Sequence, residues 1–217
     1  RGEAPHKLVI ESTVHGPILT REGRVIAVKW AGLGPTPEIV AMWKINRARN
    51  LEEYLAALDY IHSPALNMVY ADADGNIALH SCGLHPLRLP GQGRVPLDGA
   101  SGENDWLGTV PREELPLAVN PPEGYVASAN ARVAPVGYPH YLGWMWDASY
   151  RMRRLDDLLG AAEGLTLDKM KAIQTDVHDK SAEVFVPVVV EALADAELNA
   201  LERRALKALE AWDYAAT

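Results

Sequence analysis

The sequence predicts an α+β fold, with β-hairpins in the front half of the chain and mainly helices in the back half. Two hairpin patterns lie before residue 82, and amphipathic helical patterns follow one another after residue 149. Between these regions, residues 83–122 are dense in Pro and Gly, which is typical of a long ordered loop region. We therefore treat residues 1–128 as mixed α/β and residues 129–217 as mainly helical.

The first hairpin is predicted between two runs rich in β-branched residues, Lys7–Ser12 and Arg24–Trp30, with a charged tip at Arg21–Arg24. The second is predicted over residues 67–81. Its centre, Asp72–Asn76, contains an Asp-Gly pair that favours a tight turn with positive φ.

The front half also contains two predicted helices. The first begins at Thr36, with Thr as N-cap, Pro at the first position and an acid in the first turn. Its apolar face is expected to consist of Ile39, Val40, Trp43 and Ile45. Asn50 and Glu53 have the spacing of a capping box, and they open a second helix that ends before Ser63.

The back half opens with a short predicted strand at Gly124–Ser128, which leads into Asn130. Helices are then predicted from Ser149 and from Thr166, each with a capping residue at its start. Two more helical regions are expected, around residues 182–193 and 198–212.

Composition excludes several classes of function. The net charge is −8 and no Lys/Arg cluster interrupts it, so we expect no nucleic-acid partner. The longest apolar stretch, Val184–Val190, contains Pro187 and is too short to span a bilayer, so we expect no membrane span. A single cysteine excludes an intrachain disulfide framework and a multi-cysteine zinc site. The chain opens on Arg1 without a signal-peptide pattern, and we expect it to be a piece of a larger chain.

Several short motifs resemble catalytic or metal sites but are better explained as structure. Cys82 near His80 is conceivable as a nucleophile pair, although a lone Cys is more often a small buried apolar residue. Asp72–Asn76 has its Gly in the wrong place for a calcium loop. Gly99–Glu103 is one residue short of a nucleophile elbow. His178 between two Asp residues suggests a metal, but a solvated helix start explains the pattern better.

Asn130 and Arg151 form the most informative pair. Asn130 follows an expected strand, and Arg151 lies in the first turn of an expected helix. A cation at that place opposes the helix dipole, so its placement requires a partner elsewhere in the fold. Taken by composition alone, both are ordinary polar residues.

Read in order, several segments resemble the penicillin acylase family of N-terminal nucleophile hydrolases. The matching segments are Thr13–Leu19, Asn67, Tyr70–Ile77, the Pro/Gly-rich Gly83–Gly108 with Asp105 and Trp106, Asn120–Pro121, Gly124–Asn130, Arg151 with Leu155–Leu159, Gln174–Asp176 and Ala211–Asp213. Each motif is weak by itself, but their order along essentially the whole chain is specific.

The resemblance implies a segment of a four-layer αββα sandwich and an amide hydrolase acting on acylated amines. Candidate substrates are β-lactam antibiotics, N-acyl homoserine lactones and N-acyl amino acids. In this family a precursor cleaves itself, and the new N-terminal Ser attacks the amide with its own α-amine as base. The resemblance assigns catalytic roles to Asn130, as the side-chain donor of the oxyanion hole, and to Arg151, which orients it.

The resemblance also implies what this segment needs from elsewhere. Its partners are the smaller chain and the N-terminal part of the larger chain, which carries the Ser; Arg1 has no hydroxyl or thiol, so we expect this chain alone to be inactive. We assign no cofactor to this segment. Calcium is implied for the full-length protein, with one ligand a backbone carbonyl near Arg94 and another an acid near His140–Tyr141, where this sequence has none.

Family resemblance further implies a periplasmic or extracellular location. Two alternatives remain open at this stage. One is a non-catalytic scaffold or interaction domain that keeps the fold without the chemistry. The other is an unrelated α+β binding domain, which the absence of a hairpin at Asp72–Asn76 or of a strand before Asn130 would favour.

Overall fold

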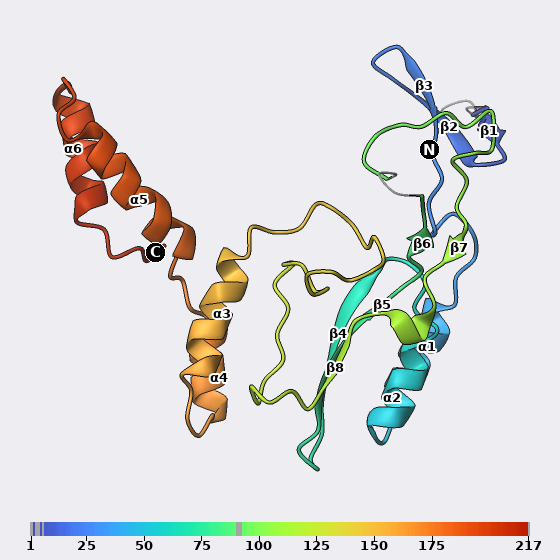
Figure 1. Cartoon of the computed structure of the whole chain (residues 1–217), viewed down its shortest axis with the longest axis horizontal. Helices are drawn as coiled ribbons and strands as arrows, with labels where there is room; N and C mark the ends of the chain where they lie inside the picture. Colours follow the sequence, from blue (N-terminus) through green and yellow to red (C-terminus); the bar gives the residue numbers. More distant parts are fainter. Residues whose placement is uncertain (1, 3–4, 6, 90–92, 217) are drawn as a thin grey trace. The chain divides into compact units, whose positions relative to one another are not determined.

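The computed structural model describes residues 2, 5, 7–89 and 93–216; Arg1 lies outside them. The described chain divides into two compact units. Unit 1 comprises Arg1–Asn120 and Ala134–Trp144, and unit 2 comprises Pro121–Val133 and Met145–Thr217. The named strands and the first two helices belong to unit 1, and the later helices belong to unit 2 (Figure 1). The fold is α+β, with strands early and helices late.

The first sheet of unit 1 is antiparallel, in the order β1 (Ser12–Thr13), β2 (Gly16–Arg21) and β3 (Arg24–Ala27). The charged tip at Arg21–Arg24 is confirmed, but the predicted strand Lys7–Ser12 is wrong except for its last residue. A strand needs a hydrogen-bonded neighbour, and β2 takes the place beside β3. The apolar residues before β1 are exposed: Leu8, Val9 and Ile10.

The second hairpin is confirmed. β4 (Leu66–Ala71) pairs with β5 (Ile77–Cys82), and β8 (Leu117–Val119) adds on the other side of β5. In the turn, the Asp72 carboxylate accepts hydrogen bonds from the backbone N–H groups of Asp74 (3.0 Å) and Asn76 (2.8 Å). Its oxygens hold the turn together, so no calcium loop is needed to explain them.

Residues 83–122 are more ordered than a loop region. They contain β6 (Pro86–Leu87), which pairs with β7 (Gly108–Thr109), then a 3₁₀ turn at Arg112–Glu114, then β8. The Pro and Gly residues limit these strands to two or three residues, because Pro donates no backbone hydrogen bond and Gly weakens a strand. Gly99–Glu103 forms bends and turns, with no strand-to-helix elbow.

Helices α1 (Glu38–Ile45) and α2 (Leu51–Leu58) pack on the sheet that contains β5. The predicted cap of α2 is confirmed, since the Asn50 side chain accepts from the Glu53 N–H at 2.8 Å. In α1, Pro37 rather than Thr36 is the N-cap.

The predicted apolar face of α1 is wrong. Ala41 is buried completely, whereas Ile39 is 83% exposed and Trp43 is 60% exposed. A small side chain allows the helix to approach the core closely, and the larger residues then point to other sides of the helix. Of the four expected residues, only Ile45 packs against the core.

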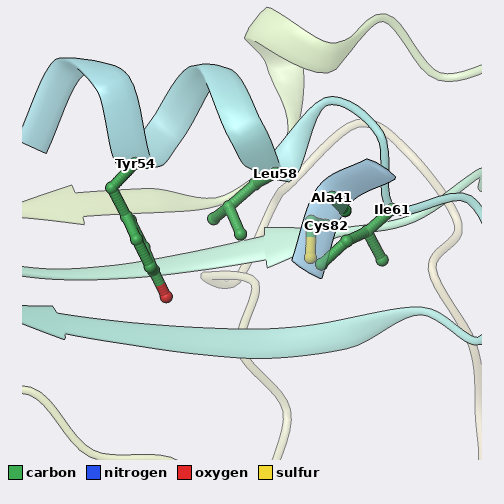
Figure 2. Close-up of a cluster of buried hydrophobic side chains, with 5 residues drawn as sticks. All are labelled: Ala41, Tyr54, Leu58, Ile61 and Cys82. Carbon is green, nitrogen blue, oxygen red and sulfur yellow. The ribbon is translucent and has the colours of Figure 1, made fainter. Parts of the chain in front are cut away.

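The core of unit 1 joins α1, α2 and β5. Its buried residues are Ala41, Tyr54, Leu58, Ile61 and Cys82 (Figure 2). Tyr54 keeps its polar end satisfied by donating to the Val69 carbonyl at 2.9 Å, and its ring lies 4.9 Å from that of Tyr70. Burial raises the pKa of the Tyr54 hydroxyl, so this group stays neutral.

Glu38 ties α1 to the segment after α2. Its carboxylate accepts from the backbone N–H groups of His62 (3.0 Å) and Ser63 (2.8 Å). Hydrogen bonds from the Thr36 side chain and the Ser63 backbone, in that order of size, lower the pKa of Glu38 to about 2.

This lowered pKa predicts a pH-dependent contribution to stability. A carboxyl group with a folded pKa below its unfolded value stabilises the fold above the unfolded pKa, and the benefit is lost as the pH falls towards the folded one. We expect Glu38→Gln to destabilise the protein at about pH 6, with the difference from wild type shrinking below about pH 4.5. Urea unfolding at several pH values measures this, with exposed Glu52→Gln as control; a difference independent of pH would contradict it.

Unit 2 contains α3 (Tyr150–Gly160), α4 (Leu167–Gln174), α5 (Lys180–Leu193) and α6 (Ala200–Glu210). Arg154 of α3 donates two hydrogen bonds to Asp176, at 2.8 and 2.7 Å, which joins α3 to the end of α4. Within the described residues, no helix has the length and apolar character needed to cross a membrane.

The predicted strand at Gly124–Ser128 is wrong, because these residues have no regular secondary structure. A side chain holds the segment instead of a backbone ladder: the Tyr125 hydroxyl donates to Asp156 of α3 at 3.0 Å. The segment therefore lies against α3 without being a strand. Asn130, just after it, lies at the start of that helix.

Candidate functional site

Asn130 lies in an exposed bend of unit 2 and has a left-handed backbone, with φ of 60°. Asn tolerates this conformation better than most residues that carry a Cβ. The Asn130 carbonyl accepts a hydrogen bond from the Asp147 backbone N–H at 2.9 Å. This bond fixes the bend to the segment that precedes α3.

Arg151 is the second residue of α3, and its partner is Asn130. The Nη2 group of Arg151 donates to Oδ1 of Asn130 at 2.9 Å. Since a guanidinium only donates, the contact sets the orientation of the carboxamide: the oxygen faces Arg151 and the NH₂ group points elsewhere. No hydrogen bond from Nδ2 of Asn130 is formed within the described residues.

Asp147 is the third member of this cluster, and it was not among the residues expected from the sequence. Its carboxylate lies 3.5 Å from Nε of Arg151, and its backbone N–H holds the Asn130 carbonyl. The signal was available, since an acid four residues before an Arg at a helix start is a favourable pair. We refer to Asn130, Asp147 and Arg151 as the carboxamide cluster.

The carboxamide cluster explains why a cation is tolerated in the first turn of α3. Ser149, the N-cap, is left-handed with φ of 65°, and its side chain makes no capping hydrogen bond. The Asp147 carboxylate places negative charge near the helix start, where it offsets the charge of Arg151. Chemically, the cluster presents one oriented N–H donor pair on a neutral amide.

The other side chains considered as catalytic or metal-binding candidates have structural roles. Cys82 is buried in the core, and burial raises the pKa of its thiol to about 11, so it is not a thiolate nucleophile. His178 contacts Glu183, and Asp179 caps α5 by accepting from Ser181 and Ala182. In the described part of the chain, no group of three or more His, Cys, Asp or Glu side chains is arranged to hold a metal ion.

The residues at the expected calcium position near His140 and Tyr141 make other contacts. His140 contacts Glu114 through Nε2, and the buried hydroxyl of Tyr141 has no hydrogen-bond partner. The Arg88 guanidinium lies over the Tyr141 ring, 5.9 Å from its centroid. Calcium requires several oxygen ligands, and a neighbouring cation opposes its binding. The surroundings of Tyr141, with the Arg88 cation on its ring, therefore do not favour a calcium ion.

The sequence profile of the penicillin amidase family matches residues 1–217. An acyl-homoserine lactone acylase QuiP from Pseudomonas fluorescens is 32% identical over 170 residues, covering 75% of this chain and 21% of the relative. A penicillin G acylase from Escherichia coli is 29% identical over 213 residues, covering 93% of this chain and 24% of the relative.

Solved structures agree with this match. A thermostable penicillin G acylase from Alcaligenes faecalis superposes with a TM-score of 0.76 at 28% identity, covering 99% of this chain and 40% of that chain. The present chain thus spans under a quarter of the two curated relatives. These matches exclude an unrelated α+β domain, although the expected strand before Asn130 is absent. The chain belongs to the penicillin amidase family.

Proposed function

We propose that this chain is a segment of an N-terminal nucleophile amidohydrolase that cleaves acylated amines, and that Asn130 supplies one donor of its oxyanion hole. One observation carries the proposal: Arg151 holds Oδ1 of Asn130, which leaves the NH₂ group available to a ligand. A neutral amide held in place suits this task, because its dipole is already oriented when negative charge develops on the carbonyl oxygen.

The nucleophile comes from outside this chain. A Ser at a chain start can pass its proton to its own α-amine, whose unperturbed pKa near ~8 suits a general base at neutral pH. No internal Ser of this chain has an α-amine of its own. We therefore propose that residues 1–217 alone are inactive and require the smaller chain and the N-terminal part of the larger one. The complete assembly forms the αββα sandwich.

The substrates proposed are acyl amides. Relatives named as acyl-homoserine lactone acylase and penicillin G acylase support N-acyl homoserine lactones and β-lactam antibiotics as classes, with N-acyl amino acids as a third. By the same family resemblance, the location proposed is periplasmic or extracellular.

Arg151 acts in this proposal as a positioning residue. In the processed full-length protein, we expect Arg151→Met to lower kcat by about 10-fold to 100-fold with little change in KM, because the carboxamide loses its orientation but not its place. Arg151→Lys, which keeps one donor and the charge, should recover part of the loss. Release of primary amine from one substrate of each class measures both constants.

Two outcomes would contradict the proposal. Hydrolysis of none of the three substrate classes by the wild-type protein supports the non-catalytic scaffold instead. Equal kcat for wild type and Arg151→Met removes the role of Arg151. Arg153 is exposed and lies two residues after Arg151 in α3, on a different side of the helix. Arg153→Met is therefore the matched control and should behave as wild type.

A further inference from the structure

Arg88 in unit 1 is a half-buried cation held by aromatic rings. Its guanidinium carbon lies 5.5 Å from the Trp106 ring centroid and 5.9 Å from that of Tyr141. Lys29 also lies over Trp106, at 5.2 Å, but its ammonium pairs with Asp105 at 3.1 Å. Arg88 has no carboxylate partner within the described residues. Burial lowers the pKa of Arg88, as expected for a cation without a counter-charge.

Two buried polar atoms near Arg88 also lack partners. These are the Tyr141 hydroxyl and Nε2 of His85, a residue that is only 8% exposed. The pKa of His85 is lowered by burial and then by the charge of Arg88, so its ring is neutral and one nitrogen donates. Buried polar groups are rarely left unsatisfied in native proteins, so the Tyr141 hydroxyl, which can donate, indicates a missing acceptor.

The local backbone keeps these side chains together. A Cβ on Gly93 would lie 3.0 Å from Cε1 of Tyr141 and 3.3 Å from Cδ of Arg88, and Gly93 has a φ of 91°. Both the positive φ and the close contacts favour glycine at this position. Arg88 and Tyr141 therefore meet at a site that a side chain on residue 93 would crowd.

A groove of about 830 Å³ gives access to Arg88. The groove is lined by more basic than acidic side chains. The basic residues are Arg24, Lys29, Arg88 and Arg94, and the acidic residues are Asp98 and Asp105. The excess of positive charge favours anions. Arg88 lines the groove, and Tyr141 lies beside the lining residue Gly93. The charge of the groove and the donor hydroxyl of Tyr141 thus both favour an anion, which is opposite to the preference of a calcium site.

We propose that Arg88 and Tyr141, with the groove beside them, form a carboxylate-binding site, in place of the calcium site that family resemblance implies. The guanidinium fork pairs with the carboxylate, and the Tyr141 hydroxyl donates to it. The carboxylate comes either from another segment of the complete protein or from a small molecule in solution. This inference does not depend on the catalytic proposal.

The experiment is thermal unfolding of the complete protein during a titration with acetate at constant ionic strength, with EGTA and with added calcium chloride. Tyr141→Phe gives the sharpest result, because it removes only the hydroxyl. With a carboxylate at the site, this variant loses a charged hydrogen bond and Tm falls. With an empty site, it removes an unsatisfied buried group and Tm rises.

The same titration separates the two sources. A small-molecule ligand raises the wild-type Tm saturably with acetate, and Tyr141→Phe weakens the acetate Kd about tenfold. A carboxylate from the protein itself makes Tm insensitive to acetate, but Tm falls in both Tyr141→Phe and Arg88→Met. Arg21→Met is the control and should match wild type in either case, because the Arg21 side chain is 83% exposed and does not line the groove.

If the site takes a carboxylate and not calcium, calcium and EGTA should shift the Tm of wild type and Arg88→Met by the same amount. The proposal is overturned if Tyr141→Phe raises Tm at saturating acetate, if acetate raises the Tm of wild type and Arg88→Met by the same amount, or if added calcium shifts the Tm of these two proteins differently. Since Tyr141→Phe keeps the ring that packs against Arg88, the test holds even if Arg88→Met fails to fold.

Discussion

Asn130→Ala in the processed full-length enzyme should lower kcat by about 100-fold to 1,000-fold, the usual cost of removing one oxyanion donor. The expected reason is geometric: Arg151 holds Oδ1 of Asn130 at 2.9 Å, and in the proposed function the NH₂ group that this leaves available meets the developing negative charge. KM should change little, since the donor acts mainly in the transition state. Steady-state amine release measures both constants.

Asn130→Gly is the matched control for the backbone. Residue 130 has a φ of 60°, which strains Ala but not Gly. Equal losses of kcat in the two variants assign the effect to the missing carboxamide, whereas a loss in Ala alone assigns it to backbone strain. Chain cleavage, followed by gel electrophoresis, should proceed in both. Turnover like wild type in Asn130→Ala would remove the oxyanion assignment.

Leu58→Ala has the largest expected effect on stability, about 2–5 kcal/mol. Leu58 is 0% exposed and lies between α2 and the sheet, in the cluster that includes Ile61 and Cys82 (Figure 2). Removing its methyl groups loses buried apolar area and leaves a cavity that the surrounding side chains fill only in part. Urea unfolding of the full-length protein measures the change in midpoint at constant slope.

Leu201→Ala is the control for this substitution. Leu201 is also helical, in α6, but it is 65% exposed. The same chemical change there should shift the free energy of unfolding by less than about 0.5 kcal/mol. Similar effects at the two positions would show that the cluster on α2 does not form the core of unit 1.

Local chemistry accounts for what the sequence predicted correctly. The Asp72–Asn76 turn and the Asn50 cap are each satisfied by hydrogen bonds within a few residues, so neither depends on distant parts of the chain. The predicted strands Lys7–Ser12 and Gly124–Ser128 failed for the complementary reason. A strand exists only beside a partner, and a single sequence does not specify that partner.

The orientation of α1 and the contacts of the candidate site also depend on tertiary packing that a single sequence does not specify. The apolar pattern of α1 favoured Ile39 and Trp43, yet packing selected the small Ala41 for the core. The position of Arg151 in the first turn of a helix drew attention to it and Asn130, but their catalytic roles came only from family resemblance, since neither belongs to a motif with a chemical signature of its own. The spacing of Asp147 to Arg151 was visible in the sequence, but the contact of its backbone N–H with Asn130 was not.

The left-handed backbone of Asn130 restricts how this position can vary during evolution or in engineering. Gln carries the same amide, but its extra methylene moves the donor and its backbone adopts a left-handed φ less readily. Asp accepts the conformation but cannot donate when ionised. With the proposed oxyanion role, conformation and chemistry select the same amino acid independently, and a library randomised at this codon and selected for activity should return Asn almost alone.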